Sequence, residues 1–280
     1  MNTALDLRGD LSPFALWLCS EGKSSGTTEK YLRDVHALAD WLDGRQLTKE
    51  TAVLWREHLL SQNYAPVTVN SMLAALNAYC RFAAADIRVK FVKVQRKLFR
   101  EQSRDLTQTE YRRLVETAYA AGNERLALLM ETICASGIRV SEVPYITVEA
   151  VRNGKAVISL KGKVRTIMLA SKLCRKLLKY AAKRKIASGG IFLTRSGQGL
   201  SRRQIWAEMK KLCKAAGVEP SKVFPHNLRH LFATTFYRIY RDIAHLADVL
   251  GHSSIDTTRI YLITTGREHQ KQLESLHLIL

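Results

Sequence analysis

The sequence predicts a mainly α-helical protein of two domains that contains one small β-hairpin. Apolar residues recur at helical spacing over most of the 280 residues. Strand-like composition occurs once, between residues 156 and 169, and a polar, basic stretch at residues 95–104 separates two helical parts. We therefore expect a helical domain at residues 1–97, a linker at residues 98–104 and a second domain at residues 105–280.

The first domain is expected to be a compact helical bundle. Its apolar stretches cover residues 11–19, 31–42, 49–60 and 69–80, and the last of them follows Pro66. In each stretch the apolar side chains recur every three or four residues and so share one helical face. Such stripes are typical of helices that bury one side in a common core.

The second domain is expected to begin with a helix and to contain the hairpin. Thr107 and Glu110 have the spacing of a capping box, in which each side chain bonds the backbone N–H of the other residue. Two β-rich runs, residues 156–160 and 164–169, flank Lys161-Gly162-Lys163 and predict a hairpin with a tight turn. Further helices are predicted at about residues 171–186, 201–215, 227–240 and 242–250.

The charge of the chain favours a polyanionic partner. Lys and Arg number 44 against 25 acidic residues, which gives a net charge of +19 at pH 7. Residues 152–214 hold eighteen basic residues and one acid, Glu208, and a second basic run covers residues 88–104. Crowded like charges repel one another, and nucleic acid relieves that repulsion while it releases its own counterions. Solubility alone is the plainer interpretation, and an anionic membrane surface is weaker because no amphipathic, aromatic-rich helix supports it.

The cysteines and the apolar runs exclude several other classes of protein. Five cysteines are scattered without a Cys-x-x-Cys pair. This pattern argues against a disulfide framework and a zinc site, and it favours a cytoplasmic protein. The longest apolar stretches are far shorter than the ~20 residues needed to span a bilayer. Near Asp6 and Asp10 no basic region precedes an apolar run, so no secretory signal is expected.

Several residues of the second domain are candidates for chemistry, although each has a plainer interpretation. Arg139 lies near a helix start, where arginines are mostly surface residues. His226 and Arg229 share one helical face because they are three residues apart. His226 and His230 also have the spacing of metal ligands, but no glutamate lies between them and no third ligand accompanies them.

Two more candidates lie close to the end of the chain. His252 follows a helix that ends in Gly251 and is typical of a turn, and Tyr261 alone would be a core aromatic residue. As a set with the arginines and a hairpin lysine, however, they suit phosphodiester cleavage. This reaction needs a nucleophile, cations for the non-bridging oxygens and a proton donor for the leaving oxygen. Arginine binds phosphate with a forked guanidinium, histidine exchanges protons near neutral pH, and tyrosine loses its proton as it attacks.

These residues lie in sequence boxes that resemble those of the tyrosine recombinase or phage integrase family, including the Xer recombinases. Residues 135–142 resemble the first-arginine box of that family, residues 226–230 its His-x-x-Arg box and residues 250–261 its closing box. The resemblance covers essentially the whole chain. It implies a helical, SAM-like core-binding domain, a mixed α/β catalytic domain, and an enzyme that cleaves and rejoins duplex DNA.

The resemblance implies a role for each candidate. Tyr261 would attack the scissile phosphate and form a 3′-phosphotyrosyl link. Arg139 and Arg229 would bind the non-bridging oxygens, His226 would be the acid/base partner of the tyrosine, and His252 would hydrogen-bond the phosphate. Neither a metal nor another cofactor is implied, because the required cations belong to the protein.

The catalytic lysine, which would protonate the 5′ leaving oxygen, has two candidates. The family usually has Gly-Lys-Gly-x-Lys-x-Arg in this hairpin, whereas residues 160–165 are one residue shorter. Alignment on Lys-Gly favours Lys161, which we prefer, and the spacing from Arg139 favours Lys163. Glu142 would orient Arg139. The residues expected to contact DNA elsewhere are Lys90, Lys93, Arg96, Lys97, Arg165, Arg202 and Arg203.

The resemblance also implies an assembly on double-stranded DNA. Four protomers would exchange strands in two rounds, with residues 266–280 packed as a helix into a neighbouring protomer through Leu273, Leu276 and Ile279. The alternative is a helix docked within the same subunit. Whether an accessory DNA-bending or directionality protein takes part stays open. The outcome of recombination also stays open: integration, excision, inversion or dimer resolution. The expected location is the cytoplasm, at the nucleoid.

Two other functions are alternatives at this point. A type IB topoisomerase-like enzyme would use similar chemistry to relax DNA without pairing two sites, but the core-binding domain and the C-terminal helix argue against it. A binding-only DNA protein would be expected to lack a catalytic residue, and all six positions are filled.

Overall fold

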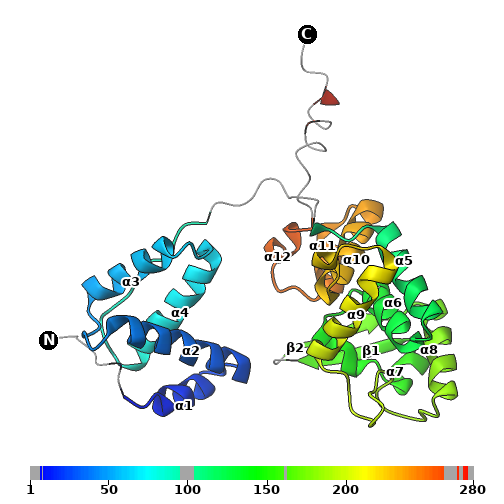
Figure 1. Ribbon diagram of the computed structural model, residues 1–280, viewed down its shortest axis with the longest axis horizontal. Helices are drawn as coiled ribbons and strands as arrows, with labels where there is room; N and C mark the ends of the chain where they lie inside the picture. Colours follow the sequence, from blue (N-terminus) through cyan, green and yellow to red (C-terminus); the bar gives the residue numbers. More distant parts are fainter. Residues whose placement is uncertain are drawn as a thin grey trace. The chain divides into compact units, whose positions relative to one another are not determined.

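The chain forms two compact units, Met1–Arg96 and Lys97–Leu280 (Figure 1). The computed structural model describes residues 7, 9–94, 104–160, 163–261, 270 and 274–276. Helices make up most of these residues, together with one two-stranded sheet, so the mainly α fold class is confirmed. The domain boundaries at residues 97 and 105 stay a prediction. Within the described part of the chain, no helix is both long and apolar enough to cross a membrane.

The first unit is built from helices around one apolar core. They are α1 (Ser12–Ser20), α2 (Ser25–Leu42), α3 (Lys49–Ser61) and α4 (Pro66–Phe82). α4 packs against the other three, and the core includes Phe14, Leu38, Trp55, Leu73 and Tyr79. Thr48 caps α3 with its side chain, and Pro66 begins α4, where its missing N–H has no helical partner to lose.

Two asparagines of α4 hold the extended segment that follows the helix. The Asn77 side chain donates to the carbonyl of Val89 at 3.0 Å and accepts from its N–H at 2.9 Å. Asn70 makes the same pair of bonds with Val92, at 2.9 and 2.7 Å. Asn70 and Asn77 lie two turns apart on one face of α4, so the segment is fixed along its side. The side chains predicted to contact DNA from this segment are exposed: Lys90 and Lys93.

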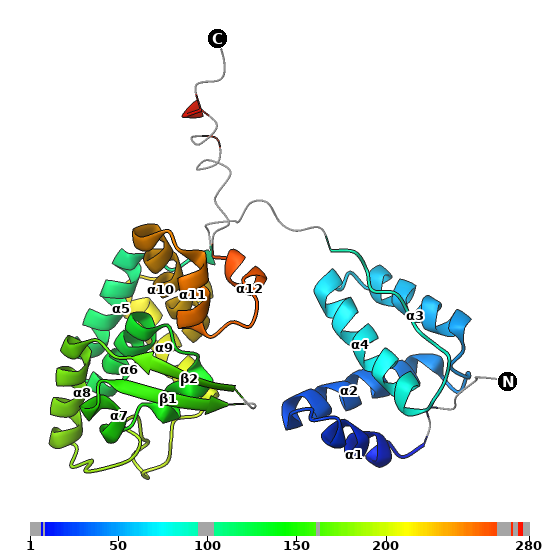
Figure 2. The ribbon, with the colours of Figure 1, turned by 180° about the vertical axis from the view of Figure 1, so that it is seen from behind.

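The second unit contains the remaining described elements. They are α5 (Gln108–Ala120), α6 (Glu124–Ser136), η2 (Val140–Tyr145), α7 (Val148–Arg152), β1 (Lys155–Leu160), β2 (Lys163–Met168), α8 (Ser171–Lys183), α9 (Arg202–Ala216), η3 (Pro220–Lys222), α10 (Pro225–Tyr240), α11 (Ile243–Leu250) and α12 (Asp256–Arg259). α6 contacts α5, α8, α9 and α10 and buries most of its side chains. It is therefore the central helix of this unit (Figure 2).

The predicted hairpin is confirmed. β1 and β2 pair antiparallel, from Lys155 opposite Met168 to Leu160 opposite Lys163. Arg165 lies opposite Ile158, whose side chain is buried, so both lie on the face of the hairpin that turns towards the core. Residues 161 and 162 lie outside the described residues.

The predicted helices of the second unit agree with α8, α9, α10 and α11 to within three residues at each end. The predicted capping box is also confirmed: the N–H of Glu110 donates to Thr107 Oγ1 at 3.2 Å, and the N–H of Thr107 donates to Glu110 Oε2 at 2.8 Å. The helix predicted at residues 266–280 lies outside the described residues, apart from 270 and 274–276.

Candidate active site

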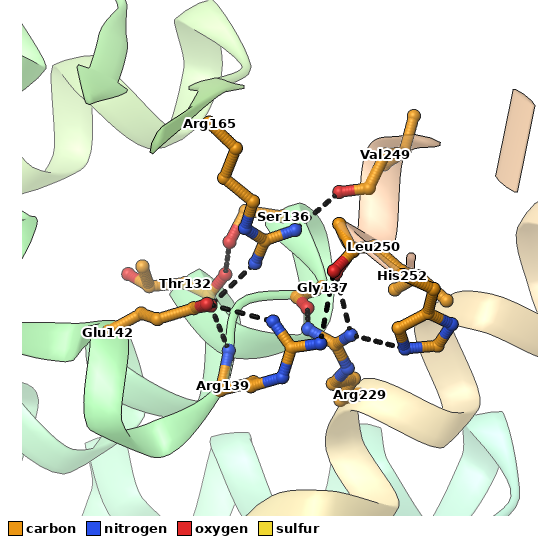
Figure 3. A network of polar contacts seen from close by, with 11 residues as sticks. Thr132, Ser136, Gly137, Arg139, Glu142, Arg165, Arg229, Val249, Leu250 and His252 are labelled. Atoms are coloured by element: carbon orange, nitrogen blue, oxygen red, sulfur yellow. Dashed lines mark hydrogen bonds and ion pairs between the residues drawn. The ribbon is translucent and has the colours of Figure 1, made fainter. Parts of the chain in front are cut away.

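The C-terminal end of α11 brings three arginine side chains together (Figure 3). The last carbonyls of a helix have no partner within it and carry its negative end. Here the two carbonyls of the preceding turn bond the N–H groups of Gly251 and His252. The next three carbonyls, of Val249, Leu250 and Gly251, accept in turn from Arg165 Nη1 at 2.8 Å, Arg229 Nη2 at 2.9 Å and Arg139 Nη2 at 3.4 Å.

Arg139 is oriented by Glu142 at the start of η2. Glu142 Oε1 accepts from Arg139 Nη1 at 3.0 Å, and its Oε2 accepts from the Arg139 N–H at 2.7 Å. The carboxylate is almost fully buried, whereas the Arg139 side chain is 38% exposed. Burial alone would raise the pKa of Glu142, but the bonds and charges of Arg139 and Arg165 outweigh it and lower that pKa. The predicted partner of Arg139 therefore contacts it directly.

Arg229 is buried between the ends of two helices. Its Nη1 donates to the carbonyl of Gly137, just after α6, at 2.6 Å, and its Nη2 donates to Leu250 at the end of α11. Burial and the neighbouring Arg139 charge lower the pKa of Arg229 to about 10, although the nearby Tyr261 raises it. The guanidinium still carries its proton at neutral pH. Gly137 adopts φ 65°, and a Cβ there would lie 2.4 Å from the Phe232 ring, so the turn requires glycine.

Positive charge exceeds negative charge at this site. Glu142 pairs with Arg139 and Arg165, and among the ion pairs of the described residues none joins Arg229 to a carboxylate. Helix-end carbonyls supply partial negative charge but no full charge. A buried or half-buried guanidinium without a counterion favours an anion beside it, and a phosphate matches its forked donors.

His252 bonds Arg229 on one side and Thr258 on the other. Its Nε2 lies 3.0 Å from Arg229 Nη2, and its Nδ1 lies 2.8 Å from Thr258 Oγ1. Because arginine only donates, Nε2 is the acceptor, and the ring proton is assigned to Nδ1. Burial, with the charges of the three arginines, lowers the pKa of His252 to about 4. The ring is therefore neutral at pH 7.

Tyr261 lies buried beside these groups, with 6% of its surface exposed. Its ring stacks on His252 at a centroid distance of 6.2 Å and tilts against His230 at 5.0 Å. Tyr261 lies close enough to Arg229 to raise the pKa of that guanidinium. An apolar cluster that includes Leu246 and Leu250 surrounds the rest of the ring. The phenol is sheltered but has direct access to a guanidinium of its own chain.

A pocket of about 790 Å³ opens beside Arg139 and Arg229. His226, exposed in the first turn of α10, lines it together with Arg139 and Arg229. Arg202 and Arg203, predicted to contact DNA, line it from the first turn of α9. The cavity thus joins candidates from two sequence boxes, 135–142 and 226–230, to two further cations.

Other predicted residues are not placed in the site. Lys161 lies outside the described residues, as do Arg96 and Lys97, and only the backbone of Lys163 is described, in β2. The choice between the two lysines therefore stays open. Among the residues that the structure describes, no group of three His, Cys, Asp or Glu side chains could hold a metal ion.

The structure adds two residues to the site that the sequence interpretation did not include. Thr258, fully buried, fixes the orientation of the His252 ring, and His230 packs against the Tyr261 ring. The sequence pattern suggests only a metal-ligand spacing for His230. The position of Thr258 within the closing box, six residues after His252, was the one signal available for it.

Comparison with known proteins agrees with this geometry. Residues 104–266 match the phage integrase family, and residues 3–86 match the SAM-like N-terminal domain of phage integrases. Tyrosine recombinase XerA of Thermococcus kodakarensis is 30% identical over 276 residues, which cover 96% of this chain and 95% of the relative.

Two solved structures share the fold. The integrase of the transposon Tn1549, in complex with transposon right end DNA, has a TM-score of 0.71 at 15% identity, over 98% of this chain and 100% of that one. A lambda integrase tetramer bound to a Holliday junction has a TM-score of 0.69 at 20% identity, over 93% of this chain and 78% of that one. The chain therefore belongs to the phage integrase family and is an Xer-like tyrosine recombinase, a site-specific enzyme that cleaves and rejoins DNA.

Proposed function

We propose that Tyr261 is the nucleophile of this recombinase and that Arg139 and Arg229 bind the scissile phosphate. The Tyr261 oxygen forms a bond to phosphorus while the bond to the 5′ oxygen breaks, which leaves a 3′-phosphotyrosyl ester. The phenol proton passes to His226, and the hairpin lysine gives a proton to the 5′ oxygen. Rejoining reverses these steps, so the ester stores the bond energy and no cofactor is consumed.

The observation that carries this proposal is that Tyr261 stacks on His252, the partner of Arg229, within a site of excess positive charge. A phosphate placed against Arg229 and the half-exposed Arg139 would neutralise charge that Glu142 alone does not balance. The same guanidinium groups would stabilise the additional charge of the pentacoordinate transition state. The neighbouring phenol would then lie within reach of the phosphorus atom.

His252 is proposed to become a hydrogen-bond donor to the phosphate only after the DNA has bound. In the free protein its Nε2 accepts from Arg229 and has no proton to give. A bound phosphate would attract the Arg229 donor and would raise the pKa of the ring, because a nearby anion stabilises imidazolium. Protonated Nε2 could then donate to a non-bridging oxygen.

The assembly is proposed from the relatives. Lambda integrase has been solved as a tetramer on a Holliday junction, and we infer that this chain likewise exchanges strands as a tetramer that pairs two DNA sites. DNA contacts are proposed for the exposed Lys90, Lys93, Arg202 and Arg203, and for Arg96 and Lys97. A strand-exchange assay with two labelled duplexes separates this activity from relaxation of a single supercoiled circle.

The role of Tyr261 can be tested with a nicked substrate that traps the covalent complex. We expect wild type to form an adduct that survives a denaturing gel, and Tyr261→Phe to bind DNA but form none. Tyr240→Phe, an exposed position of α10, is the matched control and should form the adduct normally. Undiminished adduct in Tyr261→Phe would remove Tyr261 from its assigned role.

The catalytic lysine can be identified with a 5′-bridging phosphorothiolate, whose sulfur leaves without a proton. We expect this substrate to restore cleavage by Lys161→Ala. Rescue of Lys163→Ala, with none of Lys161→Ala, would reverse the assignment.

A further inference from the structure

We propose that Arg165 is a positioning residue that couples the lysine-bearing hairpin to the phosphate-binding arginines, and that it does not contact DNA. This inference rests on the roles proposed above for Arg139 and Arg229. It replaces the earlier expectation that Arg165 is one of the DNA contacts.

Both ends of the Arg165 fork are occupied within the protein. Its Nη2 donates to Glu142 Oε2 at 2.5 Å, and its Nη1 donates to the carbonyl of Val249 at 2.8 Å. The side chain is 15% exposed, and its Nε is buried without a hydrogen-bond partner. Arg229 also has its donors occupied, but only by carbonyls and His252, whereas Arg165 already pairs with the full negative charge of Glu142 and needs no phosphate to balance it. Arg202 and Arg203 on α9, in contrast, are exposed.

The path of the Arg165 side chain is also fixed by its surroundings. It crosses Gly251, where a Cβ would lie 2.4 Å from Arg165 Cδ and 2.9 Å from both Nε and Nη1. Gly251 adopts φ 63°, so glycine is required there by the backbone and by this crossing. The guanidinium thus has one route from β2 to the end of α11.

The contacts place Arg165 at the junction of the three parts of the site. Glu142 holds Arg165 through the same oxygen that accepts from the backbone of Arg139, and its other oxygen holds the Arg139 side chain. The Val249 carbonyl accepts from Arg165, and the next carbonyl along the chain, that of Leu250, accepts from Arg229. Loss of Arg165 would leave this shared oxygen and the Val249 carbonyl without a side-chain donor. It would also release β2 from the end of α11. β2 begins two residues after Lys161.

The charge of Arg165 reaches the other members of the site. It contributes to lowering the pKa of both Arg229 and His252, after burial and the charges of nearer groups. His226, Arg139 and Arg229 are the other charged or titratable groups that act on His252. Removal of the Arg165 charge should therefore move the pKa of His252 upward from about 4. If Arg165 lay far from His252 and only contacted the DNA backbone, its removal would leave the pKa of His252 unchanged.

The test compares Arg165→Ala and Arg165→Lys with Thr166→Ala, an exposed neighbour on the opposite face of β2. DNA affinity is measured over a range of salt concentrations with each change in a Tyr261→Phe background, and cleavage is measured on the nicked substrate with Tyr261 present. We expect the affinity and its salt dependence to stay unchanged in all three. Cleavage should fall about 100-fold in Arg165→Ala, because a displacement near 1 Å at a reacting group costs about that much. Thr166→Ala should cleave as wild type does.

Arg165→Lys keeps the charge but can reach only one of the two acceptors, so cleavage should recover in part. The pKa of His252, followed by NMR of labelled histidine in the free protein, should rise in Arg165→Ala and stay low in Arg165→Lys and Thr166→Ala. This NMR measurement does not depend on DNA. If Arg165→Ala does not fold, Arg165→Lys is the variant to compare with wild type.

Two results would overturn the inference. One is a weaker affinity of Arg165→Ala with a salt slope smaller by about one unit, which would make Arg165 a phosphate contact. The other is wild-type cleavage by a folded Arg165→Ala. If wild type itself forms no Tyr261 adduct, the proposed function fails instead, and the NMR result alone then decides whether Arg165 acts on the site.

Discussion

Replacement of Glu142 by Gln should both destabilise the catalytic unit and slow cleavage. The carboxylate is 2% exposed and accepts three donors: the Arg139 N–H, Arg139 Nη1 and Arg165 Nη2. An amide keeps the shape of the side chain but has only one acceptor oxygen. If that oxygen replaces Oε2, the amide NH₂ faces Arg139 Nη1, and a donor then lies against a donor at 3.0 Å.

The magnitude follows from these contacts. Hydrogen bonds to charged groups contribute about 1.5–3 kcal/mol each, and removing one partner of a buried ion pair costs about 3–5 kcal/mol. Since Glu142→Gln retains part of the set, we expect the free energy of unfolding to fall by about 2–4 kcal/mol. For a unit of this size that lowers Tm by about 5–15 °C. Cleavage should slow about 100-fold because Arg139 loses its orientation at the phosphate.

The assays are urea unfolding followed by circular dichroism, and adduct formation on the nicked substrate. Glu149→Gln is the matched control, because Glu149 is exposed and its carboxylate accepts from the N–H of Gly189. It should lose less than about 1 kcal/mol. Glu142 would have no such role if Glu142→Gln unfolded at the same urea concentration as wild type and formed adduct at the same rate.

Three further outcomes are expected. Gly251→Ala should unfold more easily and cleave more slowly than Gly154→Ala, since both glycines have φ near 64° but only a Cβ at Gly251 would collide with Arg165; equal effects in the two variants would show that the crossing is unimportant. The pKa of His252 is depressed to about 4 in the folded state, so only the unfolded state gains a proton as the pH falls below about 6.5. The free energy of unfolding should therefore decline between pH 6.5 and 4, by about 1–2 kcal/mol after solvent screening. His252→Asn should remove this part of the decline. Inorganic phosphate should raise Tm more than chloride at equal ionic strength, and Arg229→Gln should abolish the difference; a difference that persists in Arg229→Gln would place the anion elsewhere.

Much of the fold could be predicted because its signals are local. The Thr107–Glu110 capping box and the hairpin at residues 155–168 depend on neighbours in sequence, and both form as expected. Helix ends shifted by up to three residues, since the last turn of a helix depends on packing as well as on sequence.

The arrangement around the arginines could not be predicted in the same way. The resemblance identified Arg139, Arg229, His252 and Tyr261 as a set, but their partners lie far along the chain. Arg165 bonds a carbonyl 84 residues later, and Arg229 bonds one 92 residues earlier. No local pattern distinguishes an arginine that contacts a helix end from one that contacts DNA, so the sequence alone places Arg165 among the expected DNA contacts.

The most direct test of the account is to locate the DNA on the protein after cleavage. The trapped complex would be digested with a protease and a nuclease, and the peptide that carries a nucleotide would be sequenced by mass spectrometry. We predict a single modified residue, Tyr261, joined through its oxygen to a 3′ phosphate. A nucleotide on any other residue, or on Tyr261 through a 5′ phosphate, would contradict the account.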